Sequence, residues 1–469
     1  MPVPDERFED HLRYPQGRGH APAGEAFSGS AGGAACGDLV RFSLTVERDR
    51  VADAGFEASG CGATIAAASA AVKLVRGAPV LDAARVGTRE IAAELGGLSV
   101  GKLHAADLAA DALHWALGRA AAASAQLPPT PGRTLVAMSG GVDSAVAATL
   151  SGPGAVAVTL ELWADPDNDG ESSCCSAQAV RTARALAHRM GMAHFTLDLR
   201  DAFRAGVVQP YLDGHAAGTT PNPCVGCNGH VRLDAMLAFA DRLGAATLAT
   251  GHYARTTQEG LLRQAADPAK DQSYMLAALS PATIRRLRFP LGDLAKPRVR
   301  EIAREHGLSV ADKPDSQDLC FLAGTGRSAF LERHGGMRER PGQIIDRRGR
   351  VLGRHRGHHS FTVGQRRGLG VGGGQDPLYV VATDARANTV TVGPREALAQ
   401  TRVPVGGLRL HRPETEVDAV KLRYRTREVP CRLRGGRLEL LEPFEGVAPG
   451  QSAVFLRGDV VVGCATITR

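Results

Sequence analysis

The chain has 469 residues, of which 43% are hydrophobic, 22% are charged and 4% are aromatic. This composition excludes a disordered or fibrous protein, and the length is too great for a single hydrophobic core. A prior of roughly 150 residues per domain predicts about three domains. No segment reaches roughly 18 consecutive apolar residues, and the N-terminal sequence MPVPDER lacks the basic start and apolar run of a signal peptide. We therefore expect a cytoplasmic protein without a membrane segment.

The nine cysteines would be kept reduced in the cytoplasm, so we expect catalysis or metal binding from them rather than structural disulfides. The net charge of +7 is unevenly placed. Between Arg338 and Arg367, nine arginines stand against Glu339 and Asp346, a local excess of seven positive charges. This arginine cluster is typical of a surface that binds nucleic-acid phosphates, although charge alone favours an ordinary solvated surface equally.

Three changes in residue composition and hydrophobic pattern divide the chain. Residues 1–120 form an Ala-rich unit with its own cysteines, and residues 121–132 (AAASAQLPPTPG) are small, Pro-rich and unpatterned, which predicts a linker. Over residues 133–335, short apolar runs alternate with helical periodicity, which predicts an α/β domain with a parallel sheet. The expected strands lie at 135–138, 155–160, 195–199 and 247–250, with helices through 180–190 and 233–243.

Beyond residue 336 the helical periodicity largely stops. Short β-branched or alternating runs, separated by turn sequences, predict a β-rich tail with strands at 378–383, 389–392, 453–456 and 460–468. We divide this tail into a small β-rich central domain at 336–398 and a C-terminal β-barrel at 399–469. The expected protein is therefore multidomain, and its N-terminal unit is α+β.

The sequence Ser139-Gly140-Gly141-Val142-Asp143-Ser144 follows a predicted strand and opens a predicted helix. Its glycines allow backbone N–H groups to approach an anion at the positive helix N-terminus, so phosphate is the expected guest. The loop lacks the Walker A lysine and the dinucleotide glycine spacing. It resembles the pyrophosphatase loop of PP-loop ATPases, which split ATP into AMP and pyrophosphate while activating a carbonyl oxygen. ATP is thus the implied cosubstrate, and Asp143 could help to hold Mg²⁺.

Three cysteines lie in two further motifs. Cys224 and Cys227 form a C-x-x-C after TPNP, and Cys320 lies in DSQDLCF. A lone C-x-x-C can be half of a zinc site, but no second pair follows at zinc-finger spacing. Over residues 133–469 the chain resembles the bacterial tRNA-specific 2-thiouridylase family, through these two motifs and through ATGHYAR at 249–255, KDQSY at 270–274, FTVGQ at 361–365 and PGQSAVF at 449–455.

The resemblance implies ATP-dependent adenylation of the 2-carbonyl of the tRNA wobble uridine, followed by sulfur transfer, with Cys227 as nucleophile and Cys320 as the persulfide carrier. A persulfide offers its outer sulfur to the activated carbon, and a second thiol releases it by forming a disulfide. Family members often carry Asp, with an acid-base role, where this chain has Cys224. As a third thiolate, Cys224 could instead join Cys227 and Cys320 in holding a [4Fe-4S] cluster. Both routes stay open, and the persulfide route is favoured.

The resemblance also implies the binding residues. For ATP they are Ala137, Met138, Ser139, Gly140, Gly141, Val142, Asp143, Ser144, Leu160 and Gly251. A flipped-out uridine would lie against Asn222, Pro223 and Cys224, near His252. Other tRNA contacts would come from Lys270, Asp271, Gln272, Arg423, Tyr424 and Gln451, with the arginine cluster on the phosphates. The implied partners are tRNAs that accept Lys, Glu and Gln, and a cysteine desulfurase or sulfur-relay protein as sulfur donor.

Residues 7–120 carry a second likeness, to the U-type scaffold on which iron-sulfur clusters are assembled. It rests on Cys36 and Asp38 in ACGD, Cys61 in SGCG and His104 in KLH. The third scaffold cysteine is replaced by Ala105, yet the four residues still form a plausible set for zinc or a weakly held iron-sulfur cluster. We expect a docking platform for the desulfurase, since fusion raises the effective concentration of sulfur. A purely structural domain is the alternative.

Two other functions remain open at this stage. Another PP-loop enzyme, such as an amide-forming or lysidine synthetase, would explain the loop but has no need of Cys320. A non-enzymatic iron-sulfur scaffold or sulfur carrier that binds RNA would explain the N-terminal unit but not the loop. Of the remaining cysteines, Cys174 and Cys175 are expected to be small buried residues at a helix start, and Cys431 and Cys464 to lie in the β core.

Overall fold

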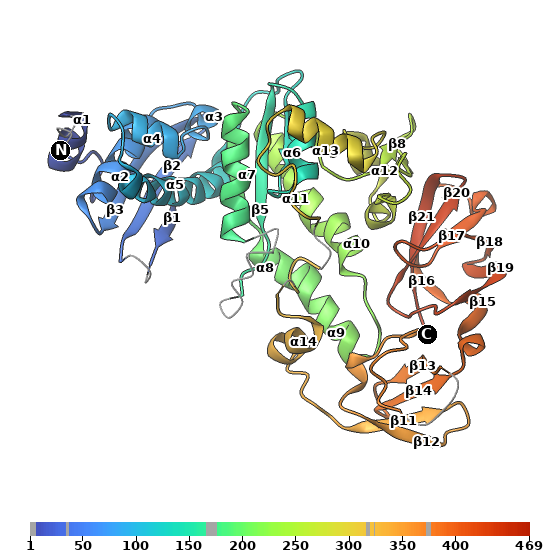
Figure 1. The fold of residues 1–469 in the computed structure, drawn as a ribbon. Helices are drawn as coiled ribbons and strands as arrows, with labels where there is room; N and C mark the ends of the chain where they lie inside the picture. The colour runs from blue at the N-terminus through green and yellow to red at the C-terminus, as the bar shows by residue number, and fades with distance from the viewer. Residues whose placement is uncertain (1–5, 34–36, 166–175, 316–318, 323, 372–376) are drawn as a thin grey trace.

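The computed structural model describes residues 6–33, 37–165, 176–315, 319–322, 324–371 and 377–469. Figure 1 shows an N-terminal unit at one end, a parallel-sheet domain in the middle and two β domains at the other end. Within these described ranges, no helix is both long enough and apolar enough to cross a membrane.

The N-terminal unit is α+β, as predicted. Its antiparallel sheet has the order β1-β2-β3, and Phe42 of β2 pairs in register with Phe56 of β3, both buried. The elements are α1 (Glu6–Arg13), β1 (Phe27–Gly32), β2 (Leu39–Glu47), β3 (Arg50–Ser59), α2 (Gly62–Val75), α3 (Val80–Ala83), α4 (Thr88–Glu94) and α5 (Leu103–Ser124).

Helix α5 runs further than the sequence suggested. The alanines at 121–123 are strong helix formers, so the helix continues to Ser124 and the first residues of the predicted linker 121–132 are helical. Its C-terminal half packs on strand β6 of the next domain. At Gly118 a Cβ atom would lie 2.0 Å from the carbonyl oxygen of Thr196, so this close approach requires glycine. The other domain boundaries stay predictions.

The middle domain has a five-stranded sheet of order β10-β7-β4-β5-β6, parallel throughout. Four of its strands match the predicted runs: β4 (Thr134–Ala137), β5 (Ala155–Glu161), β6 (His194–Asp198) and β7 (Thr247–Ala249). The fifth, β10 (Leu287–Arg288), was not predicted, because two residues carry no periodicity. The chain runs from β4 through β5 to β6 and then returns to the other side of β4 with β7. This switch point opens a crevice at the carboxyl ends of the strands.

Helices flank this sheet, as Figure 1 shows. The predicted helices are confirmed as α7 and α11. On one side Val142 and Val146 of α6 share a core with Val299 and Ile302 of α13. The helices are α6 (Val142–Leu150), α7 (Ala177–Arg189), α8 (Arg200–Phe203), α9 (Gln209–Ala216), α10 (Pro223–Cys227), α11 (Leu233–Arg242), α12 (Pro281–Arg286), α13 (Lys296–Glu305) and α14 (Arg327–Gly335).

The β-rich tail forms two sheets. The central one has the order β12-β11-β14-β13, from β11 (Gly342–Asp346), β12 (Val351–His355), β13 (Tyr379–Asp384) and β14 (Thr389–Gly393). The C-terminal sheet has the order β15-β19-β18-β17-β20-β21-β9-β8, with β16 also on β21. Its own strands are β15 (Ala399–Val403), β16 (Val405–Leu410), β17 (Ala419–Lys421), β18 (Val429–Arg434), β19 (Arg437–Glu445), β20 (Ser452–Arg457) and β21 (Val460–Ile467).

Two short strands of the middle segment join the C-terminal sheet, which sequence reasoning missed. They are β8 (Arg255–Thr256) and β9 (Leu262–Arg263), and Arg263 pairs with Val460 of β21. The sheet therefore ties the segment after β7 to the end of the chain. Cys431 and Cys464 are buried within it, as predicted.

Candidate active site

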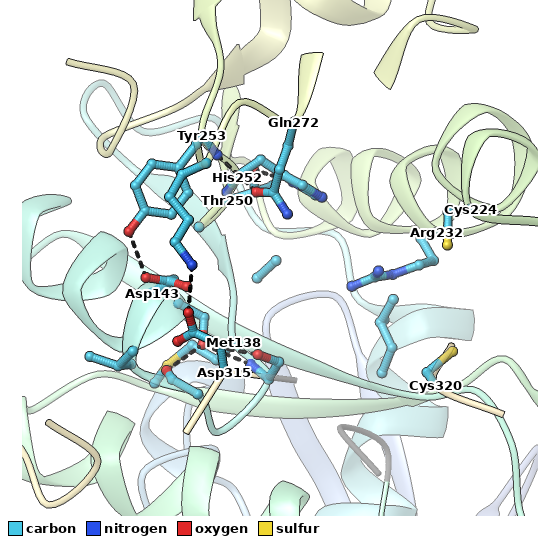
Figure 2. A pocket seen from close by; sticks show the side chains of 18 of the residues that line it. Met138, Asp143, Cys224, Arg232, Thr250, His252, Tyr253, Gln272, Asp315 and Cys320 are labelled. Atoms are coloured by element: carbon cyan, nitrogen blue, oxygen red, sulfur yellow. Dashed lines mark hydrogen bonds and ion pairs between the residues drawn. The ribbon is translucent and has the colours of Figure 1, made fainter. Parts of the chain in front are cut away.

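A cavity of about 390 Å³ lies at the carboxyl ends of β4, β5 and β7. It brings together the nucleotide loop, one cysteine of the C-x-x-C, the persulfide candidate and part of the predicted tRNA set. The predicted site residues that line it are Ala137, Met138, Ser139, Gly141, Val142, Asp143, Ser144, Leu160, Cys224, Gly251, His252, Lys270, Gln272, Cys320 and Tyr424. Figure 2 shows Asp143 and Asp315 toward one end and Cys224, Arg232 and Cys320 toward the other.

The nucleotide loop is held open by short contacts. The Ser144 hydroxyl accepts a hydrogen bond from the Ser139 N–H at 3.1 Å and donates one to the Gly141 carbonyl at 3.0 Å. Gly140 has a φ of +68°, and a Cβ atom there would lie 2.7 Å from the carbonyl oxygen of Ala179. A Cβ atom on Gly251 would lie 2.8 Å from the Ser144 nitrogen. Glycine at both positions lets the start of α6 present its backbone N–H groups to an anion.

Charged groups gather beside this loop. The Asp143 carboxylate accepts hydrogen bonds from the Tyr253 hydroxyl at 2.8 Å and from Lys296 Nζ at 2.7 and 2.8 Å. Asp315 pairs with Lys270 at 2.7 Å and with Lys296 at 2.8 Å. Burial opposes the charge of Asp315, but the hydrogen bonds from these two lysines outweigh it and lower its pKa to about 2. Both carboxylates line the cavity.

The C-x-x-C occupies the short helix α10, where the Asn222 side chain caps the Cys224 N–H at 3.2 Å. Cys224 lines the cavity, whereas Cys227 is buried and lies outside its lining. Burial raises the pKa of the Cys224 thiol, and the positive charge of Arg232 opposes that rise. Cys320 is partly exposed and faces the same cavity.

The predicted tRNA residues fall into two groups. His252, Lys270, Gln272 and Tyr424 line the cavity, and burial, assisted by Arg232, lowers the pKa of His252 to about 3, which keeps this ring neutral. The remaining side chains contact protein instead. Asp271 accepts from the Ala265 and Ser273 N–H groups, Arg423 donates to the Val363 carbonyl at 2.8 Å, and Gln451 donates to the Thr220 carbonyl at 2.7 Å. Their contact with tRNA stays a prediction, as does that of Asn222 and Pro223.

Sequence reasoning missed several lining residues. Arg232, Lys313 and Asp315 line the cavity, and Lys313 Nζ donates to the Gly140 carbonyl at 3.0 Å. Asp315 opens the DSQDLCF motif, so the motif itself was a usable signal. Arg232 follows Cys227 on the same helical segment, whereas nothing in the spacing singles out Lys296 or Lys313.

A second group of metal-ligand side chains lies in the N-terminal unit. The Asp38 carboxylate accepts from the Cys61 N–H at 3.0 Å and from the Thr64 hydroxyl at 2.8 Å, and it lies 3.6 Å from His104 Nε2. Among the described residues, Asp38, Cys61 and His104 form the one group close enough to share a metal ion. Cys224, Cys227 and Cys320 do not form such a group. Cys36, Cys174 and Cys175 lie outside the described residues, and Ala105 is fully buried.

All nine arginines of the cluster between Arg338 and Arg367 are exposed. Two of them are paired: Arg350 with Asp346 at 3.1 Å and Arg356 with Glu339 at 3.0 Å. The cluster therefore remains a positively charged surface on the central β domain and the segment that follows β12.

Four family models match consecutive parts of the chain. They are NifU-like N terminal domain at 5–124, tRNA methyl transferase HUP domain at 132–324, tRNA methyl transferase PRC-barrel domain at 328–394, and Aminomethyltransferase beta-barrel domain at 410–467.

Similar curated proteins cover either nearly the whole chain or about 70% of it. The "Bifunctional protein NifU/MnmA" of Rubrobacter xylanophilus is 44% identical over 99% of this chain and 98% of its own length. The "tRNA-specific 2-thiouridylase MnmA" of Rhizorhabdus wittichii is 45% identical over 71% of this chain and 90% of its own. The protein of the same name from Thermobifida fusca is 44% identical over 72% of this chain and 96% of its own length.

Proposed function

The chain belongs to the family of bifunctional NifU/MnmA proteins and is a tRNA 2-thiouridylase, and we propose that it adenylates the wobble uridine in the cavity described above and then transfers sulfur from Cys320. The observation that carries this mechanism is that the nucleotide loop and Cys320 line one cavity. ATP at the loop and a persulfide on Cys320 would then reach the same uridine ring.

In the proposed sequence, the uridine O2 attacks the α-phosphorus of ATP and pyrophosphate leaves. The outer persulfide sulfur then adds to C2, and AMP departs with the original oxygen. The Cys227 thiolate attacks the Cys320 sulfur, so that a Cys227–Cys320 disulfide forms and 2-thiouridine is released. The persulfide sulfur is reduced and the two thiols are oxidised, so an external thiol reductant must restore the enzyme.

The residues around the loop fit the magnesium ion that accompanies ATP. Mg²⁺ in nucleotide sites is held by one or two carboxylates together with phosphate oxygens, and Asp143 and Asp315 provide two carboxylates at the cavity wall. When bound, the ion would neutralise charge on the pyrophosphate. The chain's own part is to orient the phosphates with the loop N–H groups and with Lys313.

A [4Fe-4S] cluster on Cys224, Cys227 and Cys320 is the alternative form of the sulfur donor. The persulfide route is favoured because these three thiols are not grouped as a metal site, whereas the carboxylate, thiol and imidazole of the N-terminal unit are. Iron and acid-labile sulfide counts on anaerobically purified, active Cys61→Ser protein separate the two routes, because this change removes a ligand of the N-terminal site. Fewer than one iron per active chain supports the persulfide.

For the N-terminal unit we propose a second role, as a zinc or iron-sulfur site that docks the sulfur donor. The observation that favours it is the group formed by Asp38, Cys61 and His104. The donor would be a cysteine desulfurase or a sulfur-relay protein. For the protein as a whole, we propose the tRNAs that accept Lys, Glu and Gln as substrates. We propose the cytoplasm as its location. Metal content of the wild type against Cys61→Ser and His104→Ala tests the site, with loss of bound metal in both variants expected.

The adenylation step has its own test. Adding tRNA to the full chain with MgATP should release AMP and pyrophosphate. A protein that only carries sulfur or binds RNA would release neither.

A further inference from the structure

Lys296 pairs with two acidic residues of the cavity wall, Asp143 and Asp315, without lining the cavity itself. It is the first residue of α13, it is buried, and it is not among the described residues that line the cavity. Its ammonium lies 2.7 and 2.8 Å from the two Asp143 oxygens and 2.8 Å from Asp315 Oδ1. One buried cation therefore joins the first turn of α6 to the start of the segment that carries Cys320.

The position of Lys296 is fixed independently of these contacts. Its backbone N–H donates to Asp267 Oδ2 at 3.1 Å, which caps the N-terminus of α13. One helical turn later Arg300 also pairs with Asp315, at 3.0 Å. Lys296 and Arg300 lie on the same face of α13, and both hold Asp315. The apolar core that α13 shares with α6 keeps the helix next to Asp143.

Burying an ammonium is costly unless it is paired, and two carboxylates that approach one point repel each other unless a cation separates them. The Lys296 ammonium is paired, and it lies between the Asp143 and Asp315 carboxylates, so both costs are offset. Three cationic groups, Lys270, Lys296 and Arg300, pair with the two carboxylates, and Lys313 bonds the Gly140 carbonyl of the nucleotide loop. Cations beside the loop suit a polyphosphate, and two carboxylates at its edge suit the magnesium ion that accompanies it.

We propose that Lys296 is a positioning residue of the nucleotide site, which holds Asp143 and Asp315 side by side where the pyrophosphate of ATP leaves. The inference rests on the proposed function, because it places ATP at the nucleotide loop. Lys296 does not touch the reacting atoms. It sets the spacing of the two carboxylates that meet the magnesium-bound phosphates.

The test uses the full chain and α,β-methylene ATP, whose binding is measured by calorimetry at several Mg²⁺ concentrations. Lys296→Met should weaken binding at least about tenfold and raise the Mg²⁺ concentration needed for half-maximal binding, because a charge-assisted contact of this kind contributes that much. Lys296→Arg should recover most of the affinity. Lys73→Met, which removes an exposed lysine paired with Glu94 in the N-terminal unit, is the matched control and should bind like the wild type.

If Lys296→Met does not fold, Asp315→Asn removes one of the two carboxylates and should weaken binding and shift the Mg²⁺ dependence in the same direction. Wild-type affinity and Mg²⁺ dependence in Lys296→Met, or in Asp315→Asn where the first variant is unfolded, overturn this inference alone. A wild type that does not bind the analogue overturns the proposed function with it. A large loss in Lys296→Met that Lys296→Arg fails to recover also overturns the positioning role, since the cation itself would then not be what matters.

Discussion

The thiols of Cys224 and Cys320 line one cavity, although they lie in separate motifs on opposite sides of β7 in the sequence (Figure 2). Arg232 lines the same wall and opposes the rise that burial causes in the pKa of Cys224. Cys227 is one helical turn from Cys224 but is buried outside the lining. The two members of the C-x-x-C therefore have different environments, and they should respond differently to substitution.

Replacing Cys227 or Cys320 by Ala should abolish 2-thiouridine formation, because the proposed cycle needs one thiol to carry sulfur and another to release it. Binding of tRNA, measured by filter retention, should stay near that of the wild type. Cys431→Ala, in the core of the C-terminal sheet, is the control and should retain thiolation. Full activity in either of the first two variants would contradict the assigned roles.

Cys224→Asp should retain thiolation if sulfur travels as a persulfide, because a carboxylate can supply acid-base chemistry at this position but not a thiolate ligand for a [4Fe-4S] cluster. The measurement is the thiouridine content of tRNA after a single turnover with preloaded enzyme. Loss of all activity in Cys224→Asp, together with iron in active Cys61→Ser protein, would favour the cluster route instead.

Asp111→Ala should destabilise the junction between α5 and the parallel sheet. Asp111 pairs with Arg181 at 2.6 Å and with the buried Arg184 at 2.5 Å, so its removal leaves a buried guanidinium without its partner. The expected cost is about 3–5 kcal/mol, read from the first transition in denaturant unfolding. Asp107→Ala, on the exposed face of the same helix, removes only an exposed hydrogen bond from the Thr88 hydroxyl and should cost about 1 kcal/mol or less. Equal effects of the two changes would argue against a docked N-terminal unit.

Stability should fall as the pH is lowered through about 6.5, because of His114 and His194. Burial, with Arg184 and neighbouring histidines adding to it, lowers the pKa of both rings well below the ordinary histidine value of 6.5. The unfolded chain then binds protons that the folded chain does not, so this contribution is present above pH 6.5 and is lost as the pH falls toward the folded pKa values. Unfolding midpoints between pH 5 and 8 measure it, and His114→Gln should flatten the profile. An unchanged slope in that variant would contradict the assignment.

Short apolar runs predicted the strands β4, β5, β6 and β7, and helical periodicity predicted α7 and α11. These patterns could not predict β10, which has two residues, or the pairing of Arg263 with Val460, which depends on tertiary contacts between distant segments. The predicted linker begins at residue 121, whereas α5 continues to Ser124, because a run of alanines suits both a linker and the end of a helix.

In the candidate site too, some residues were predictable from sequence motifs and others were not. The motifs predicted Asp143, Cys224, Cys320 and most of the nucleotide loop. They did not supply Lys296, whose role depends on α13 packing against α6, or the orientation of Asp271, Arg423 and Gln451 toward protein groups. Side-chain direction depends on three-dimensional neighbours that a motif does not encode.

The most direct test follows AMP and 2-thiouridine together. The full chain, with sulfur loaded on Cys320, is mixed with unmodified tRNA and MgATP, and both products are quantified by mass spectrometry over a single turnover. We expect one AMP for each thiouridine formed, and neither product from wild-type enzyme without tRNA. Thiouridine formed without AMP, or formed by the Cys320→Ala variant, would contradict sulfur transfer from Cys320 to an adenylated uridine.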